Sequence, residues 1–375
     1  MTGRRHTTSL KFKTFMFTTA LAATVAVGGG ALFSGQAWAQ ASSAAIAKLS
    51  GPDRQKILED GARKEGKVTI YSSMIVNQLI RPIGDGLEKK YPFIKFEYWR
   101  GDTAPILQKV MAERRSNAIV HDVLEYSGTA VMSAIQAGAV ESFTSPVLAT
   151  FDPATYDSKT GFWAGTRISY FGLAYNTKLV ADKDVPKTHA DLLNPMWKGK
   201  MVWGTSDTGR LQFVQNVLIA MGEKDGEAYL KKLSTQNMVQ SSASARALVD
   251  QVGQGEYPIA VHIYAHHPLI SREKGAPLNS SMLEPIDSGL GGIQIAKNGP
   301  NPHAAMLLID FMLSKEGQTI IGNADYFPVN PGVEPGATTR HIVPRYNGMK
   351  ETVFTPEILF ARRDSGLALV EKYFK

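Results

Sequence analysis

Short β-rich runs alternate with amphipathic helical patterns over most of this chain, and the alternation constrains the fold more than any other feature of the sequence. Residues 67–71 (KVTIY) are one such run, and a pattern with its apolar residues on one helical face follows over 77–90. Strands that alternate with helices are typical of units built around a mostly parallel sheet. We therefore predict an α/β fold.

The same alternation continues to the C-terminus. The predicted strands are residues 67–71, 94–99, 118–124, 169–179, 201–204, 257–261 and 290–296. The predicted helices are residues 51–65, 77–90, 106–115, 210–221, 225–233, 245–252, 304–313 and 356–373, with one more that ends near Ala139.

The N-terminus has the three parts of a secretory signal peptide. Four basic residues precede an uncharged apolar run, 15–33, and the small-x-small triplet 37–39 (AWA) follows it. Residues 1–39 are predicted to be cleaved after Ala39, which leaves 336 of the 375 residues. The alternative is a single membrane anchor, but glycines and threonines dilute the run, whereas a spanning helix needs about 20 predominantly apolar residues.

Charge and cysteine content narrow the function. The formal net charge is +7, but without the four basic leader residues 37 Lys and Arg stand against 34 Asp and Glu, so no nucleic-acid partner is expected. Because the chain has no cysteine, disulfides, thiolate metal sites, a cysteine nucleophile and a lipidated N-terminal cysteine are excluded. We expect a protein that diffuses freely in the periplasm of a double-membraned bacterium.

The mature length of 336 residues suits about two domains of roughly 150 residues each. No long Pro-, Gly- or Ser-rich linker separates two halves. Two lobes without a linker imply that the chain crosses between them more than once.

Several segments, in their order and spacing, resemble the extracellular solute-binding proteins of ABC importers, in the branch related to ferric-iron-binding receptors. The matching segments are 65–73 (EGKVTIYSS), 90–95 (KYPFIK), 172–177 (GLAYNT), 185–188 (VPKT), 191–193 (DLL), 253–257 (GQGEY), 302–318 (PHAAMLLIDFMLSKEGQ) and 327–329 (FPV).

This resemblance implies a type II periplasmic binding fold, in which two lobes, each a mixed and mostly parallel sheet with flanking helices, are joined by two crossover hinge strands. By analogy, lobe one is 66–168 plus 287–375, and lobe two is 169–286. The implied function is that of a receptor that captures a small solute by cleft closure and delivers it to an inner-membrane ABC permease. We expect no cofactor, no enzymatic activity and a monomer. An exported hydrolase or lyase on a similar fold is the alternative of another class, although no catalytic motif is found.

Hydroxyl-rich clusters follow predicted strands and precede predicted helices, where backbone N–H groups and positive helix ends favour anions. In open α/β sheets such strand ends border the ligand cleft. We predict an oxyanion, such as a phosphonate, sugar phosphate or carboxylate, with Arg167 as a further candidate partner for it. Helix N-capping is the alternative explanation for these serines and threonines. The predicted ligand-binding residues are Ser72, Ser73, Thr103, Tyr126, Ser127, Tyr170, Thr205, Ser206, Thr208, Ser242, Arg246 and Tyr264.

A ferric or other metal site is the alternative that the resemblance raises, because the iron receptors supply adjacent tyrosines, with a histidine and a glutamate in many members. In this chain Ile75, Ser127 and the pair Ala265-His266 stand at those positions, so the pattern is not kept. A helix over the nearby histidines would suit a softer divalent metal, but Pro268 follows them at once. Any metal here is expected to use Tyr264, His262, His266 and Glu125.

Overall fold

The predicted alternation of strands and helices is present in the computed structural model, which describes residues 42–374 except Ser206. The predicted signal peptide lies outside these residues. They contain many helices and a large mixed sheet, so the α/β fold class is confirmed. No helix within them is long and apolar enough to cross a membrane.

Twelve strands form a single sheet in the described part of the chain. Its main order is β2-β1-β3-β10-β5-β8-β6-β7, and the remaining strands pair with β5 or β10. The strands are β1 (Lys67–Ser72), β2 (Lys95–Arg100), β3 (Val123–Ser127), β4 (Val140–Glu141), β5 (Ala164–Asn176), β6 (Met201–Gly204), β7 (Val239–Ser241), β8 (Ile259–Tyr264), β9 (Leu278–Ser281), β10 (Ile286–Ala296), β11 (Phe327–Pro328) and β12 (Glu351–Phe354).

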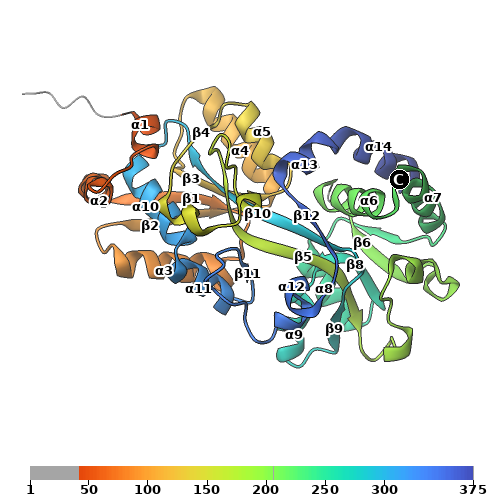
Figure 1. The fold of residues 1–375 in the computed structure, drawn as a ribbon. Coiled ribbons are helices and arrows are strands. Elements are labelled where there is room, and N and C mark those ends of the chain that lie inside the picture. The colour runs from red at the N-terminus through yellow and green to blue at the C-terminus, as the bar shows by residue number, and fades with distance from the viewer. Residues whose placement is uncertain (1–41, 206, 375) are drawn as a thin grey trace, which may run out of the picture. The chain divides into compact units, whose positions relative to one another are not determined.

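Strands β5 and β10 lie in the middle of the sheet and pair antiparallel with each other. On one side of them, β1 pairs parallel with β2 and β3, and on the other side β6 pairs parallel with β7 and β8. Figure 1 shows β5 running from the first group of strands toward the second. The two parallel groups are therefore joined through two long antiparallel strands, which is the arrangement expected of two crossover strands.

Helices cover both groups of strands. They are α1 (Ser43–Ala47), α2 (Arg54–Glu65), α3 (Arg81–Lys90), α4 (Thr103–Ser116), α5 (Ala130–Gln136), α6 (Asp207–Met221), α7 (Glu223–Ser234), α8 (Ala245–Gln254), α9 (His266–Glu273), α10 (Pro302–Leu313), α11 (Lys315–Asn323), α12 (Pro344–Asn347), α13 (Pro356–Ala361) and α14 (Arg363–Tyr373). A π-helical turn, Val76–Ile80, leads into α3, and short 3₁₀ turns connect other elements.

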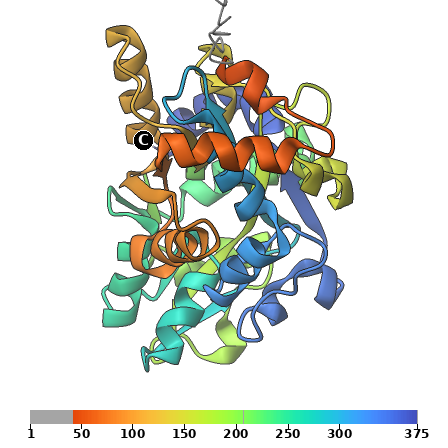
Figure 2. The same ribbon diagram turned by 90° about the vertical axis from the view of Figure 1, so that its left-hand side faces the viewer.

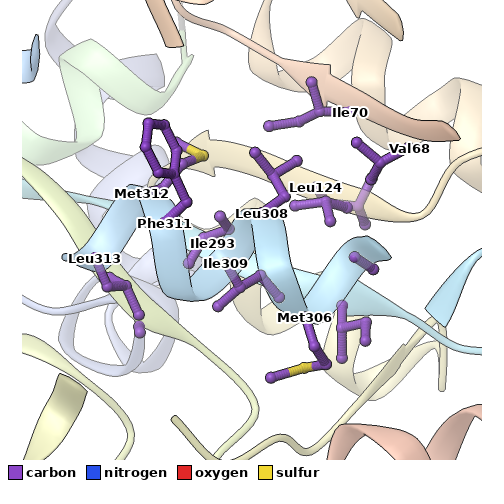
Figure 3. Packing of buried hydrophobic residues seen from close by; sticks show 14 of the residues in the cluster. Val68, Ile70, Leu124, Ile293, Met306, Leu308, Ile309, Phe311, Met312 and Leu313 are labelled. Atoms are coloured by element: carbon purple, nitrogen blue, oxygen red, sulfur yellow. The ribbon is translucent and has the colours of Figure 1, made fainter. Parts of the chain in front are cut away.

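Helix α10 is the centre of the first core. Pro302 opens it at a position whose N–H has no helical partner in any case. Its apolar side chains are buried on nearly all faces because the helix packs on β1 and β10 and is covered by α2, the long helix that faces the viewer in Figure 2. Figure 3 shows Leu308 and Ile309 of α10 beside Leu124 and Ile293 of the sheet. This packing holds the strands of the first group, and with them the loops at their carboxyl ends.

A second core lies between α6, α7 and the strands of the second group. Val370 and Phe374 of the C-terminal segment belong to it, because α14 packs on α6. The sequence-based boundary instead placed all of 287–375 in lobe one. The chain breaks its expected helix at Arg362 and crosses to α6, where a Cβ on Gly366 would collide with Leu211 and Gln215. The exact lobe boundaries otherwise stay a prediction.

Local differences from the predicted elements have simple causes. Strand β3 begins at Val123 rather than at residue 118, and α9 was not predicted at all. Pro268 argued against a helix, but it occupies the first turn of α9, where proline is tolerated because its missing N–H is not needed.

Candidate functional site

A cavity of about 510 Å³ lies where the carboxyl ends of strands meet the beginnings of helices. Ser73, just after β1, and Thr103, at the start of α4, line it from the first group of strands. Thr205 and Ser242 line it from the second group, after β6 and β7. Because residues of β5 and β10 also line the cavity, the two central strands connect its two walls.

The first turns of four helices, α4, α6, α8 and α9, border the cavity. The N–H groups of a first helical turn have no partner within the helix, and the helix dipole adds partial positive charge at this end. Both effects favour an anion. Ser244 already caps α8 by accepting from the Ala247 N–H at 3.3 Å, so part of this donor capacity is used within the chain.

The charged residues of the cavity wall are unequal in sign. Among the lining residues whose side chains the structure describes, the cations are the four arginines Arg100, Arg167, Arg210 and Arg246, and the only carboxylate is Asp102. Arg100 and Asp102 form a partly exposed ion pair with an N–O distance of 2.8 Å. Because Arg167 and Arg246 are also paired with the carboxylates of Glu125 and Asp250, the preference of the wall for anions rests mainly on helix geometry.

Arg167 on β5 is the most buried of these cations, with 4% of its surface exposed. It forms an ion pair with Glu125, which is fully buried, and its Nη2 donates to the Ser73 hydroxyl at 3.4 Å. The other Glu125 oxygen accepts from the Ser72 hydroxyl at 2.7 Å. Gly291 makes room for this arrangement, because a Cβ there would collide with the Arg167 guanidinium.

Arg246 on α8 joins two helix beginnings. Its Nη1 donates to the backbone carbonyl of His267 at 3.3 Å, and its Nη2 contacts Ser271 at 2.5 Å and Asp250 at 2.7 Å. The guanidinium thus ties α9 to α8 beside the cavity.

His262 on β8 has an unusual backbone, with φ of 57° in the left-handed region. Positive φ is uncommon for residues other than glycine, although asparagine, aspartate and histidine adopt it more often than the rest. The ring stacks on Phe171 with centroids 4.4 Å apart, and Nε2 lies 2.7 Å from Oδ2 of Asp287. Gln212 donates to the other Asp287 oxygen at 2.5 Å. This network binds β5, β8, β10 and α6 together at the cavity wall, which Phe171, His262 and Gln212 help to line.

The structure places the sequence-predicted ligand residues in three groups. Those that line the cavity are Ser73, Thr103, Thr205, Ser242, Arg246 and Tyr264. The side chains of Ser127 and Thr208 and the whole of Ser206 lie outside what the structure describes. Whether any of the first group binds a ligand stays a prediction.

Three predicted ligand residues lie in the protein interior instead. Ser72 is fully buried on Glu125, and Tyr126 is fully buried with its hydroxyl donating to Gln294 at 2.8 Å. Tyr170 packs edge-on against Phe327 with centroids 4.7 Å apart. The prediction assigned whole strand ends to the cleft, but successive residues of a strand face opposite sides, so only part of each end can reach the cavity.

Two of the four residues of the metal alternative already have charged partners within the protein. Glu125 is paired with Arg167, and His262 with Asp287. Within the described residues no group of three or more His, Cys, Asp or Glu side chains could hold a metal ion.

The comparison with known families identifies the kind of protein. Residues 119–347, more than half of the chain, match the family model of bacterial extracellular solute-binding proteins. The chain belongs to this family. The resemblance inferred from sequence segments is thereby confirmed, including its relation to iron-binding receptors.

This solute-binding protein is similar to curated proteins of different named specificities. Iron uptake protein A1 of Synechocystis sp. is 24% identical over 253 residues, which cover 64% of this chain and 70% of the relative. A putative 2-aminoethylphosphonate-binding periplasmic protein of Salmonella typhimurium is 28% identical over 183 residues, 44% of this chain and 51% of the relative. A protein of known structure, AfuA from Actinobacillus pleuropneumoniae with exogenous fructose-6-phosphate bound, is 23% identical and superposes with a TM-score of 0.69 over 82% of this chain and 98% of its own. That likeness confirms the periplasmic binding-protein fold.

Several lining residues of the solute-binding protein were not predicted, among them Arg100, Phe171, His267 and Phe354. Arg100 is the last residue of β2. The expectation that ligands bind at the carboxyl ends of strands would have included it if charged residues had been considered as well as serine and threonine. Phe354 reaches the cavity because β12 pairs with β10, where Phe354 lies beside Gly289, and no local sequence signal reports that pairing.

Proposed function

We propose that this chain is the periplasmic receptor of an ABC importer and that it captures an anionic small solute in the cavity. The observation that carries the proposal is the cavity wall, where the first turns of helices meet and guanidinium groups contribute N–H donors. Backbone N–H groups, helix dipoles and guanidinium groups act in the same direction, toward a ligand rich in oxygen acceptors.

Capture works by closure of two lobes around the solute. Ser73 and Thr103 belong to one group of strands, Thr205 and Ser242 to the other, and a solute that contacts both is bound more tightly when the two approach. A ligand shifts the open–closed equilibrium only by its differential affinity for the two states. Strands β5 and β10 are the proposed hinge, because they alone connect the parallel groups along the sheet order.

The closed, loaded receptor is what an inner-membrane permease recognises. We further propose that the protein works as a monomer in the periplasm after cleavage at Ala39, and that it binds its solute without chemical turnover. Family relatives support the transport role; the phosphonate named for the Salmonella protein and the phosphate ester in the AfuA structure are anions.

Native mass spectrometry of the mature protein, followed by isothermal titration calorimetry with phosphonates, sugar phosphates, dicarboxylates and ferric iron, tests the proposal. We expect an anion to bind and to make the scattering profile more compact. Arg246→Gln is expected to weaken this binding at least tenfold, whereas Arg115→Gln, at an exposed site on α4, is the matched control. Binding of ferric iron in the absence of any organic anion would show that the metal alternative is correct, and release of a reaction product would show an enzyme.

A further inference from the structure

His266 and His267 begin α9 at the cavity wall and are almost completely buried, with 1% and 6% of their surfaces exposed. Neither ring nitrogen of His266 has a hydrogen-bond partner among the described residues, and neither does Nδ1 of His267. The other buried histidines of the second half are bonded: His262 to Asp287, and His189 to the Glu284 carbonyl at 3.1 Å. Outside the cavity, the buried His121 also has one unpartnered ring nitrogen, Nε2, but His266 is the described histidine with both ring nitrogens buried and unpartnered.

The surroundings of His266 within the protein are mostly aromatic rings, and no described polar atom forms a hydrogen bond with either of its ring nitrogens. Its ring lies 4.6 Å from the ring of His267, 4.8 Å from Tyr326, 5.8 Å from Phe327 and 6.0 Å from Tyr264, measured between centroids. Buried polar groups without partners are costly and rare in native proteins. Because both histidines line the cavity, the missing partners are expected to come from its contents.

The imidazole of His266 is neutral. Burial lowers the pKa of His266 well below its ordinary value, and the neighbouring His267, Arg167 and Arg246 act in the same direction. A neutral imidazole carries one N–H donor and one nitrogen acceptor. A fully ionised carboxylate or phosphoryl group only accepts hydrogen bonds, so it satisfies the N–H and leaves the other nitrogen without a donor. A hydroxyl group both donates and accepts, so it fits either nitrogen, and two hydroxyl groups satisfy both.

We propose that the solute is a hydroxylated organic anion whose hydroxyl groups hydrogen-bond with His266 and His267, while its anionic group is held by the arginines and the first turns of the helices. This inference rests on the proposed function and specifies its substrate class. A cavity of about 510 Å³ has room for a body of several hydroxylated carbons beside the anionic group. His266 is then the residue that distinguishes hydroxylated from alkyl anions.

Two pairs of probes test the selectivity in the mature full chain. Fructose 6-phosphate is compared with hexyl phosphate, and gluconate with hexanoate, so that each pair shares its anionic group and carbon number and differs in hydroxyl content. We expect the hydroxylated member of one pair to bind about 10- to 100-fold more tightly, because the alkyl member leaves the histidine nitrogens unpaired. The two pairs also tell a phosphoryl from a carboxylate head group.

The variant His266→Phe keeps a ring of similar shape and removes both nitrogens. We expect this variant to bring the affinity ratio of the selective pair close to one, mainly because it binds the hydroxylated ligand more weakly. Its melting temperature should be no lower than that of the wild type. His267→Phe, measured in the same way, keeps the test usable if the first variant fails to fold. His341→Phe, at an exposed site, is the control and should keep the wild-type ratio.

Equal binding of both members of each pair by the wild type would overturn the inference and leave the proposed function intact. Retention of the full ratio by both folded variants would overturn it as well. If no phosphate, phosphonate or carboxylate binds at all, the proposed function itself fails, and the inference with it.

Discussion

Replacement of Glu125 by glutamine removes the carboxylate that neutralises Arg167. Both residues are buried, with 0% and 4% of their surfaces exposed, so the guanidinium loses its counter-ion in a place with little water. Removing one partner of a buried ion pair costs about 3–5 kcal/mol, mostly because the remaining charge is uncompensated. Since Arg167 lines the cavity and keeps its contact with Ser73, we expect the lower end, about 3 kcal/mol.

The converse variant, Arg167→Met, leaves the Glu125 carboxylate in the interior. The Ser72 hydroxyl at 2.7 Å and the Thr166 hydroxyl at 3.3 Å still donate to it, but no cation remains. We expect the free energy of unfolding to fall by a similar amount, about 3 kcal/mol. The double variant E125Q/R167M carries neither buried charge. Its loss in free energy of unfolding should therefore be at least about 2 kcal/mol smaller than the sum of the losses in the two single variants.

Urea denaturation of the mature protein at pH 7, followed by circular dichroism, measures these free energies of unfolding. Added phosphate should stabilise E125Q more than the wild type, because the uncompensated guanidinium faces the cavity. The reasoning is refuted if each single variant costs less than about 1 kcal/mol, or if the double variant costs the full sum.

Three further predictions concern packing and pH. Gly366→Ala places a methyl group against Leu211 and should destabilise the protein by about 1–3 kcal/mol, seen as a lower melting temperature; an unchanged value would mean that α14 does not pack on α6. Leu308→Ala leaves a cavity in the first core and should lower the free energy of unfolding, measured by urea denaturation, by about 2–5 kcal/mol. Ile57→Ala, at a site 43% exposed, should lower it much less. Equal effects would contradict the core assignment. Burial lowers the pKa of His267 from 6.5 to about 3, so between these values the unfolded chain binds a proton that the folded protein does not. His267 should therefore reduce the free energy of unfolding by about 2 kcal/mol as the pH falls from 7 to 5, and urea curves of His267→Phe should show a correspondingly smaller loss.

Much of the fold was predictable because its signals are local. The apolar stripe of α3, the short strand β1 and the continuous apolar run of α10 each follow from residues close together in the chain. The order of the segments from 65–73 to 327–329 was enough to recognise the family, since homologous chains keep their elements in sequence. The break at Arg362 and the packing of α14 on α6 were missed because both depend on contacts with residues about 150 positions earlier.

The candidate site was predictable only in part, and the difference between Ser72 and Ser73 shows why. Both end the same strand, and their sequence contexts are alike, yet the first is buried on Glu125 while the second lines the cavity. The sequence placed His266 only in the metal alternative and His267 in no predicted site, because Pro268 argued against the helix that brings both to the cavity.

The amino-acid sequence by itself therefore determined the fold class and the family, and it predicted a ligand at strand ends and helix beginnings. These properties arise from periodicity and from backbone geometry, which act over a few residues. Only the tertiary structure decided which side chains meet in the cavity and which charges are paired before any solute arrives. That outcome depends on contacts between β5, β8, β10 and four helix beginnings, which are distant in sequence and are brought together by the packing of the two cores.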